Sequence, residues 1–193
     1  MSSLDGKIMV CNLALGKLGL PPIQSLEQAN NASRACNQFY NHCLSFVLRQ
    51  HFWGFATKRR TLSHLTETPD TEFSYQFSLP TDLVRLEVLL DEEHYEENDG
   101  KLLADVTPIS IKYVYLNTNV ASYSSDFIEA FALYLAHSMC VSLVANMQLS
   151  KDLYQEYVIA LSRARTADSG ESRNKKAVDM TSWERGRLGY GQS

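Results

Sequence analysis

The sequence predicts a mixed α+β protein: a discontinuous helical bundle built from both ends of the chain, a β-rich insertion between its second and third helices, and an extended C-terminal tail. Apolar residues recur at helical spacing before residue 50 and again after residue 125. Between residues 73 and 115 they alternate with polar residues, which is the period of a half-buried strand. After Thr166 large apolar residues become sparse, which is typical of a segment without its own core.

Two helices are expected in the N-terminal third. A stripe of apolar residues predicts a helix over residues 5–18, and Gly19 followed by two prolines should end it, because proline cannot continue the hydrogen-bond ladder. A longer stripe predicts a second helix over residues 28–50. The aromatic residues Phe52 and Trp53 follow it and are expected to plug the core between the helices and the insertion.

The insertion is expected to contain several short strands. Alternation predicts strands over residues 73–79, 84–90 and 109–115. Asp99-Gly100 suits the tight turn of a hairpin. The period-2 block therefore separates the two helical parts of the chain.

Helices return near residue 125. Asp126 with Glu129 three residues later predicts a capping box at the start of a helix over residues 125–148. This segment is apolar nearly all round, so it should be the buried central helix of the bundle. A final helix is expected over residues 150–165.

Residues 166–193 carry too few apolar side chains to offset their own ordering entropy, so this tail should be flexible when alone. Aromatic and arginine side chains are common anchors at interfaces, so the tail is expected to dock to a partner, with a frayed terminus as the alternative. The candidate partner-binding residues are Arg173, Lys175, Lys176, Trp183, Arg185, Arg187 and Tyr190. The predicted division of the chain is 1–54 with 124–165 as the helical bundle, 55–123 as the β-rich insertion, and 166–193 as the tail.

The composition and the charge of the chain exclude some functional classes of protein. A net charge of −4 argues against a protein whose main role is to grip nucleic acid. No apolar run is expected to reach the roughly 20 residues that span a bilayer. The first residues lack the features of a signal peptide, so the protein is expected to be made and kept in a reducing cytoplasm.

The four cysteines include no CxxC pair, so buried free thiols are expected. A metal site at Cys36, His42 and Cys43 is the alternative, but neighbouring positions on a helix do not converge on one ion. We expect no metal and no cofactor.

Each charged segment of the sequence admits more than one functional interpretation. Residues 66–105 hold twelve of the 22 acids, with only two basic residues, and favour a solvated loop. Lys58-Arg59-Arg60 fits a protected strand edge, salt bridges between subunits, or contact with DNA. A catalytic role for Asp91-Glu92-Glu93 with His94 is the weakest alternative, because no hydrolase or phosphate-binding motif is present. No catalytic residue is therefore expected.

Several segments resemble a known family: NLALGKLG (12–19), PPIQSLE (21–27), WGFA (53–56), YQFSLPTDLVR (75–85), IKY (111–113) and FIEAFALYLA (127–136). Ala35-Cys36, Tyr40, Arg59 and Leu62 extend the likeness, which covers most of residues 10–165. In this order and spacing they resemble the phage tail tubular protein A family, the head-to-tail connector or adaptor proteins of short-tailed phages and related prophages.

The resemblance implies a structural virion protein at the head-to-tail junction. Family members form dodecameric rings between the portal and the tail nozzle or tube, through which phage DNA passes. The tail would correspond to the portal-docking extension, and the acidic loop 91–99 could line the lumen and repel DNA. A tail-associated cell-wall hydrolase and a DNA-binding packaging factor are the alternatives.

Overall fold

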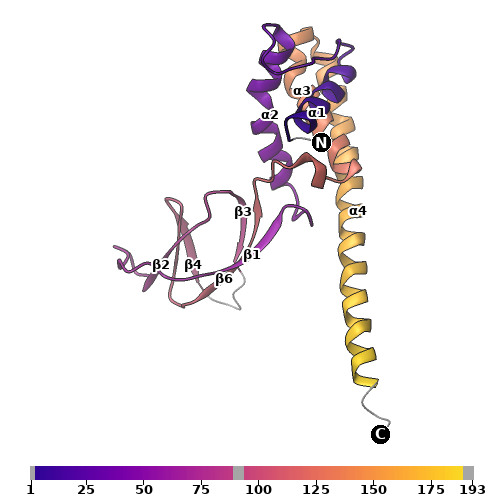
Figure 1. The fold of residues 1–193 in the computed structure, drawn as a ribbon. Helices are drawn as coiled ribbons and strands as arrows, with labels where there is room; N and C mark the ends of the chain where they lie inside the picture. The colour runs from indigo at the N-terminus through magenta and orange to yellow at the C-terminus, as the bar shows by residue number, and fades with distance from the viewer. Residues whose placement is uncertain (1–2, 89–93, 189–193) are drawn as a thin grey trace. The chain divides into compact units, whose positions relative to one another are not determined.

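The computed structural model describes the backbone of residues 3–88 and 94–188, and the side chains of residues 5–87 and 94–171. This part of the chain holds four α-helices and two small antiparallel sheets, a mixed α+β arrangement (Figure 1). The helices are α1 (Ser3–Lys17), α2 (Asn31–Arg49), α3 (Ser125–Val144) and α4 (Met147–Leu188), with a short 3-10 helix η1 (Val120–Ser122). The strands are β1 (Thr57–Leu62), β2 (Tyr75–Ser78), β3 (Leu83–Val88), β4 (Tyr95–Asn98), β5 (Lys101–Ala104) and β6 (Ile109–Tyr115).

The chain divides into two compact units. The helical unit comprises Met1–Val47 and Asn119–Ser193, and the β-rich unit comprises Leu48–Thr118. These boundaries lie a few residues before those expected from the sequence, at 54/55 and 123/124. Arg49 accounts for the first difference, because its guanidinium donates to the Val84 carbonyl at 3.1 Å and its own carbonyl accepts from Arg85 at 3.3 Å, and both partners lie in the β-rich unit.

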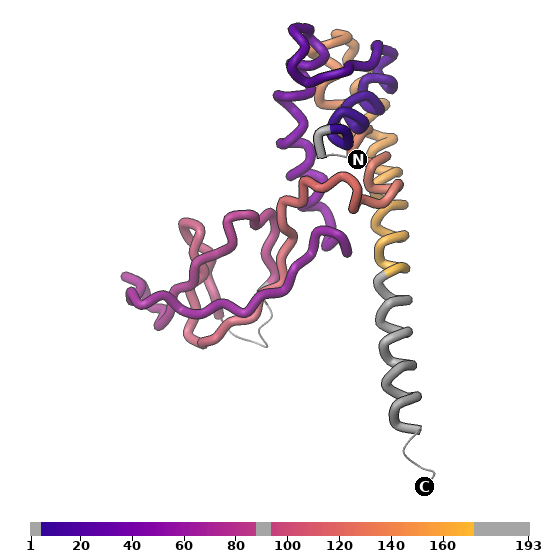
Figure 2. Tube along the Cα trace, in the orientation of Figure 1, coloured from indigo at the N-terminus to yellow at the C-terminus, as the bar shows by residue number. Residues whose placement is uncertain are grey.

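The helical unit brings together segments from both ends of the chain (Figure 2). The loop between α1 and α2 is held to α1 by the Asn12 side chain, which exchanges two hydrogen bonds with the backbone of Ile23, at 2.8 and 2.9 Å. Gly19 adopts a positive φ of 70° directly after α1, as the predicted helix stop requires. Lys17 at the end of α1 pairs with Glu129 of α3 at 2.6 Å.

α3 is the central helix of this unit. Tyr40 of α2 meets Phe131 edge-on at 5.1 Å between ring centroids, and Phe46 stacks on Tyr134 at 4.5 Å. The expected burial is confirmed for the middle of α3, while Val141 near its C-terminus is 49% exposed. The expected capping box is wrong: Ser124 is the N-cap, and its hydroxyl accepts a hydrogen bond from the Phe127 amide at 3.3 Å.

By length and composition, α3 could cross a membrane, so the expectation that no apolar run reaches that length is wrong. About half of the apolar window of α3 is buried inside the structure. The buried core helix of a soluble protein has the same length and composition, so this feature alone is weak evidence for a membrane span.

α4 is the largest departure from the sequence-based expectation. It begins at Met147, after Ala145 in the left-handed conformation ends α3 with a φ of 53°. It then continues to Leu188, so the expectation of an extended segment from residue 166 is wrong for residues 166–188. The buried stripe of α4 that packs in the helical unit consists of Ser150, Leu153, Tyr157, Leu161 and Ala164.

The β-rich unit contains two three-stranded sheets, with strand orders β1-β6-β3 and β2-β5-β4. The predicted hairpin is confirmed: β4 pairs with β5 around Asp99 and Gly100, which have φ values of 47° and 71°. Strand β6 matches its predicted bounds, and β2 and β3 match the two other predicted strands approximately. A shared core of buried residues includes Leu62, Phe77, Leu102, Ile109, Ile111 and Tyr113.

Candidate functional site

Six of the seven predicted partner-binding residues lie on the second half of α4. The backbone from Arg173 to Arg187 is helical, but the side chains beyond residue 171 are outside the described part, and Tyr190 lies outside the described residues altogether. Positions 173, 176, 180, 183 and 187 follow the three- and four-residue spacing of a single helix stripe. The helix therefore places Arg173, Lys176, Trp183 and Arg187 in one row with Met180, and it places Lys175 and Arg185 outside that row.

A second candidate surface consists of basic residues in the β-rich unit. Arg85 lies over the Phe52 ring at 4.5 Å, and Lys112 lies over the same ring at 4.1 Å. Lys112 also pairs with Glu87 of the neighbouring strand at 2.7 Å. Phe52 is half-buried in this contact, so within the β-rich unit it serves as a platform for two cations.

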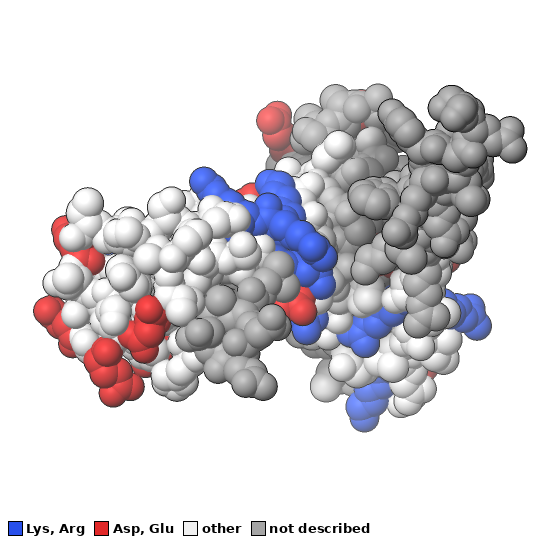
Figure 3. Space-filling model, turned by 90° about the horizontal axis from the view of Figure 1, so that it is seen from below, with Lys and Arg blue, Asp and Glu red and all other residues white. Residues whose placement is uncertain are grey.

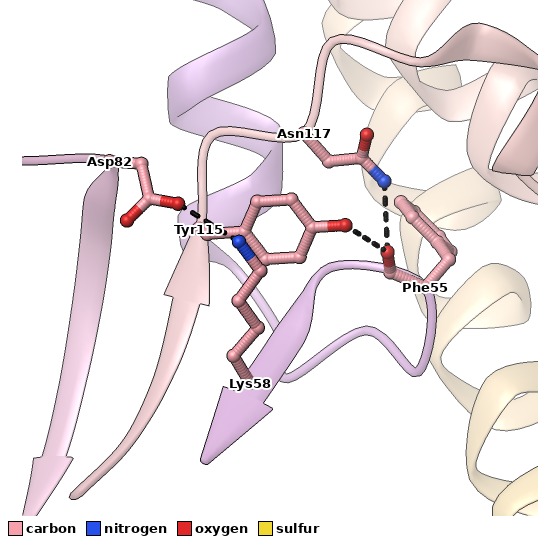
Figure 4. Close-up of polar contacts among 5 residues, drawn as sticks. All are labelled: Phe55, Lys58, Asp82, Tyr115 and Asn117. Carbon is pink, nitrogen blue, oxygen red and sulfur yellow. Dashed lines mark hydrogen bonds and ion pairs between the residues drawn. The ribbon is translucent and has the colours of Figure 1, made fainter. Parts of the chain in front are cut away.

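The run Lys58-Arg59-Arg60 lies on β1, where four consecutive side chains are exposed. Lys58 is engaged: its ammonium pairs with Asp82 at 3.1 Å and lies 3.8 Å from the centroid of the Tyr115 ring (Figure 4). The hydrogen bond to Asp82 raises the pKa of Lys58. Arg59 and Arg60 form no ion pair with the residues that the structure describes. These two guanidinium groups are therefore the part of the run that is available to a partner.

Asn117 and Tyr115 hold the turn before β1 in place. Figure 4 shows both side chains directed toward Phe55, whose carbonyl accepts from the Asn117 Nδ2 at 2.8 Å and from the Tyr115 hydroxyl at 3.2 Å. Asn117 is only 5% exposed. This anchoring positions the start of β1, and with it the basic run, against β6.

Replacing Asn117 with Ala should lower the free energy of unfolding by about 1–3 kcal/mol, because a partly buried carbonyl loses a donor. Tyr115→Phe, which removes one weaker bond to the same carbonyl, should cost about 1 kcal/mol. Urea unfolding of the two variants beside the wild type measures both values. An Asn117→Ala variant as stable as the wild type would show that the amide contributes nothing to this turn.

In the view of Figure 3, several acidic side chains of the β-rich unit gather at one end, away from a group of basic ones, although Asp82 and Glu87 pair with basic residues. Glu96 and Glu97 lie on β4, where all four side chains are exposed. Glu67, Asp70 and Asp99 line a hollow of about 430 Å³. Inside it Lys101 donates to Gln76 at 3.0 Å, and Gln76 donates to the Glu67 carbonyl at 2.9 Å. Lys101, Gln76 and the Glu67 carbonyl therefore bond to one another, and their role in this hollow is structural.

The residues of the weak catalytic alternative are only partly described. Asp91, Glu92 and Glu93 lie outside the described residues, and the His94 ring stacks on Phe73 at 5.2 Å between centroids. The acidic loop 91–99 is therefore seen only from His94 onward.

The candidate metal ligands do not converge. Cys36 and Cys43 are buried, whereas His42 between them along the chain is exposed. The Cys43 thiol contacts the Ser138 hydroxyl at 3.3 Å, and burial raises its pKa to about 11. A hydrogen bond between Cys11 and Cys36 raises the pKa of Cys11 and lowers that of Cys36. In the described ranges, no group of three His, Cys, Asp or Glu residues is suited to a metal ion.

No protein-family model matches the chain, and a comparison with characterised proteins finds no significant match. The connector resemblance therefore rests on the residues quoted for it.

Proposed function

We propose that this chain is a structural virion protein, a head-to-tail adaptor that forms a ring between the portal and the tail and lets phage DNA pass. Its finer architecture would be a helical bundle interrupted by a β-rich insertion. The proposal extends to three partners: the portal, the tail nozzle or tube, and further copies of the chain. The observation that carries it is the length of α4.

α4 has 42 residues and α3 has 20. At about 1.5 Å per residue, α4 is about 63 Å long and α3 about 30 Å, so roughly half of α4 extends beyond the length of its main packing partner. The buried stripe of α4 accordingly ends at Ala164 within the described side chains. A helix that cannot pack on its own bundle along this length is suited to dock to another protein.

The second half of α4 is a weak helix on its own account. It contains Gly170 and Gly186, and each glycine in a helix interior costs about 1 kcal/mol relative to alanine. Most of the stability of a helix in a protein comes from tertiary packing and not from the propensity of its residues. A partner that packs against the row Arg173, Lys176, Met180, Trp183 and Arg187, with Trp183 as its large aromatic anchor, would supply the missing stabilisation, as in helix-in-groove complexes.

Truncation after Ala167 tests the proposal. The shortened chain keeps the whole buried stripe of α4, so the helical unit should stay folded by circular dichroism, while stable attachment to portal-bearing heads should be lost. Co-sedimentation of the full-length and truncated proteins with such heads measures attachment. Equal binding by both proteins would show that α4 beyond Ala167 does not dock the portal.

A pair of point variants makes the test sharper. Trp183→Ala should weaken attachment by about 2 kcal/mol or more, as expected for an aromatic anchor. Arg173→Ala on the same stripe should cost only about 0–1 kcal/mol, because an exposed ion pair contributes little. Val178→Ala, on the same helix but outside the stripe, serves as the matched control and should bind like the wild type. Electron microscopy of the protein mixed with its portal then shows whether a ring forms.

A further inference from the structure

Two of the four outer strands of the β-rich unit's sheets, β1 and β4, carry exposed side chains of opposite charge. β1 is the outer strand of its sheet and pairs only with β6, and β4 is the outer strand of the other sheet and pairs only with β5, within the part of the unit that the structure describes. Four of the six side chains of β1 and all four of β4 are exposed. An exposed edge offers unpaired backbone groups to a further strand.

The charges on β1 and β4 disfavour the pairing of either strand with the same strand of another copy. β1 carries Lys58, Arg59 and Arg60 without an acid, and β4 carries Glu96 and Glu97 without a basic residue. Like charges opposite one another destabilise a strand pair, whereas opposite charges stabilise it. A β1–β1 or β4–β4 contact is therefore unfavourable, and a β1–β4 contact between two copies is favourable.

We propose that β1 of one copy adds to β4 of the next copy, in an antiparallel pair that sets Arg59 opposite Glu97 and Arg60 opposite Glu96. The same register sets Thr61 opposite Tyr95, which is 44% exposed in the single chain. Lys58 is held by Asp82 within its own unit, so Arg59 and Arg60 make the contact.

This pairing is a head-to-tail contact, because it joins two different surfaces of identical chains. Contacts of this kind build a ring when the rotation closes. The inference therefore deepens the proposed ring function, on which it rests, by naming the edge through which subunits associate. It also places the β4 acids against the neighbouring subunit, and not on a lumen wall.

Charge reversal of the full chain tests the contact. Arg59→Glu with Arg60→Glu, and separately Glu96→Arg with Glu97→Arg, should each weaken self-association by about tenfold or more, because two attractive pairs become repulsive. Sedimentation velocity over a concentration series measures the association. Circular dichroism should be unchanged, since all four side chains are exposed.

The two reversed proteins should associate when mixed, because the acidic β1 of one then meets the basic β4 of the other. A chain carrying all four reversals should self-associate like the wild type. Matched controls change charge by the same amount at exposed positions of the helical unit: Lys151→Glu with Arg163→Glu, and Glu27→Arg with Glu156→Arg. Both controls should associate like the wild type.

A wild-type chain that stays monomeric at the highest soluble concentration overturns the inference. So do reversed variants that associate as strongly as the wild type, or a mixture that fails to recover. If rings on the portal persist in both reversed variants, the adaptor function stands and only this contact is removed.

Discussion

Replacing Phe131 with Ala should lower the free energy of unfolding of the helical unit by about 3–5 kcal/mol. Phe131 is fully buried in α3, and its ring meets Tyr40 at 5.1 Å and Phe127 at 6.1 Å between centroids. Removing it leaves a cavity between helices that come from opposite ends of the chain. The helical signal in circular dichroism should therefore be lost at a lower urea concentration.

Phe77→Ala is the counterpart in the β-rich unit. Phe77 is fully buried on β2, opposite Leu102 of β5, so the same loss of about 3–5 kcal/mol is expected there. Trp53 is fully buried in that unit and reports its unfolding by fluorescence in a Trp183→Phe background.

Each core variant should shift mainly the signal of its own unit. Val141→Ala, an exposed position on α3, is the control and should change stability by less than about 1 kcal/mol. Equal shifts of both signals in both core variants would contradict a division into two units and indicate a single cooperative core.

Gly6→Ala should destabilise the helical unit by about 1–3 kcal/mol, although alanine favours a helix more than glycine does. A Cβ atom at Gly6 would lie 2.7 Å from the Cβ of Val120 in η1. This neighbour is at the base of its side chain and cannot rotate away, so α1 or η1 must shift. Thermal unfolding followed by circular dichroism measures the loss.

Gly16→Ala on the same helix is the matched control. A Cβ at Gly16 meets no atom within 4 Å, so this variant should be stabilised by up to about 1 kcal/mol. If Gly6→Ala and Gly16→Ala raise stability equally, α1 and η1 do not pack as closely as the structure shows.

Features governed by neighbouring residues were predictable from the sequence. The hairpin at Asp99 and Gly100 depends on two residues that tolerate positive φ, and both adopt it. The stop after α1 depends on Gly19 and the prolines behind it. The buried middle of α3 follows from a helix with apolar residues on every side.

The length of α4 was not predictable from the same reasoning. The composition after Thr166 indicates that this segment cannot form a core, but a helix continues from a packed nucleus at the gain of one hydrogen bond per residue. The packed stripe up to Ala164 supplies that nucleus. Composition therefore indicated wrongly that residues 166–188 are extended.

The candidate surfaces show the same division between local and long-range information. The sequence by itself determined the elements: helices at both ends, an alternating block between them, a basic run at Lys58-Arg59-Arg60 and a group of acids, because spacing and turn residues act over a few positions. Only the tertiary structure decided that Lys58 pairs with Asp82, whereas Arg59 and Arg60 have no ion partner among the described residues. It also decided that β1 and β4 are outer strands of their sheets. Those outcomes depend on which strands pair and in which register, and strand pairing joins residues far apart in the chain.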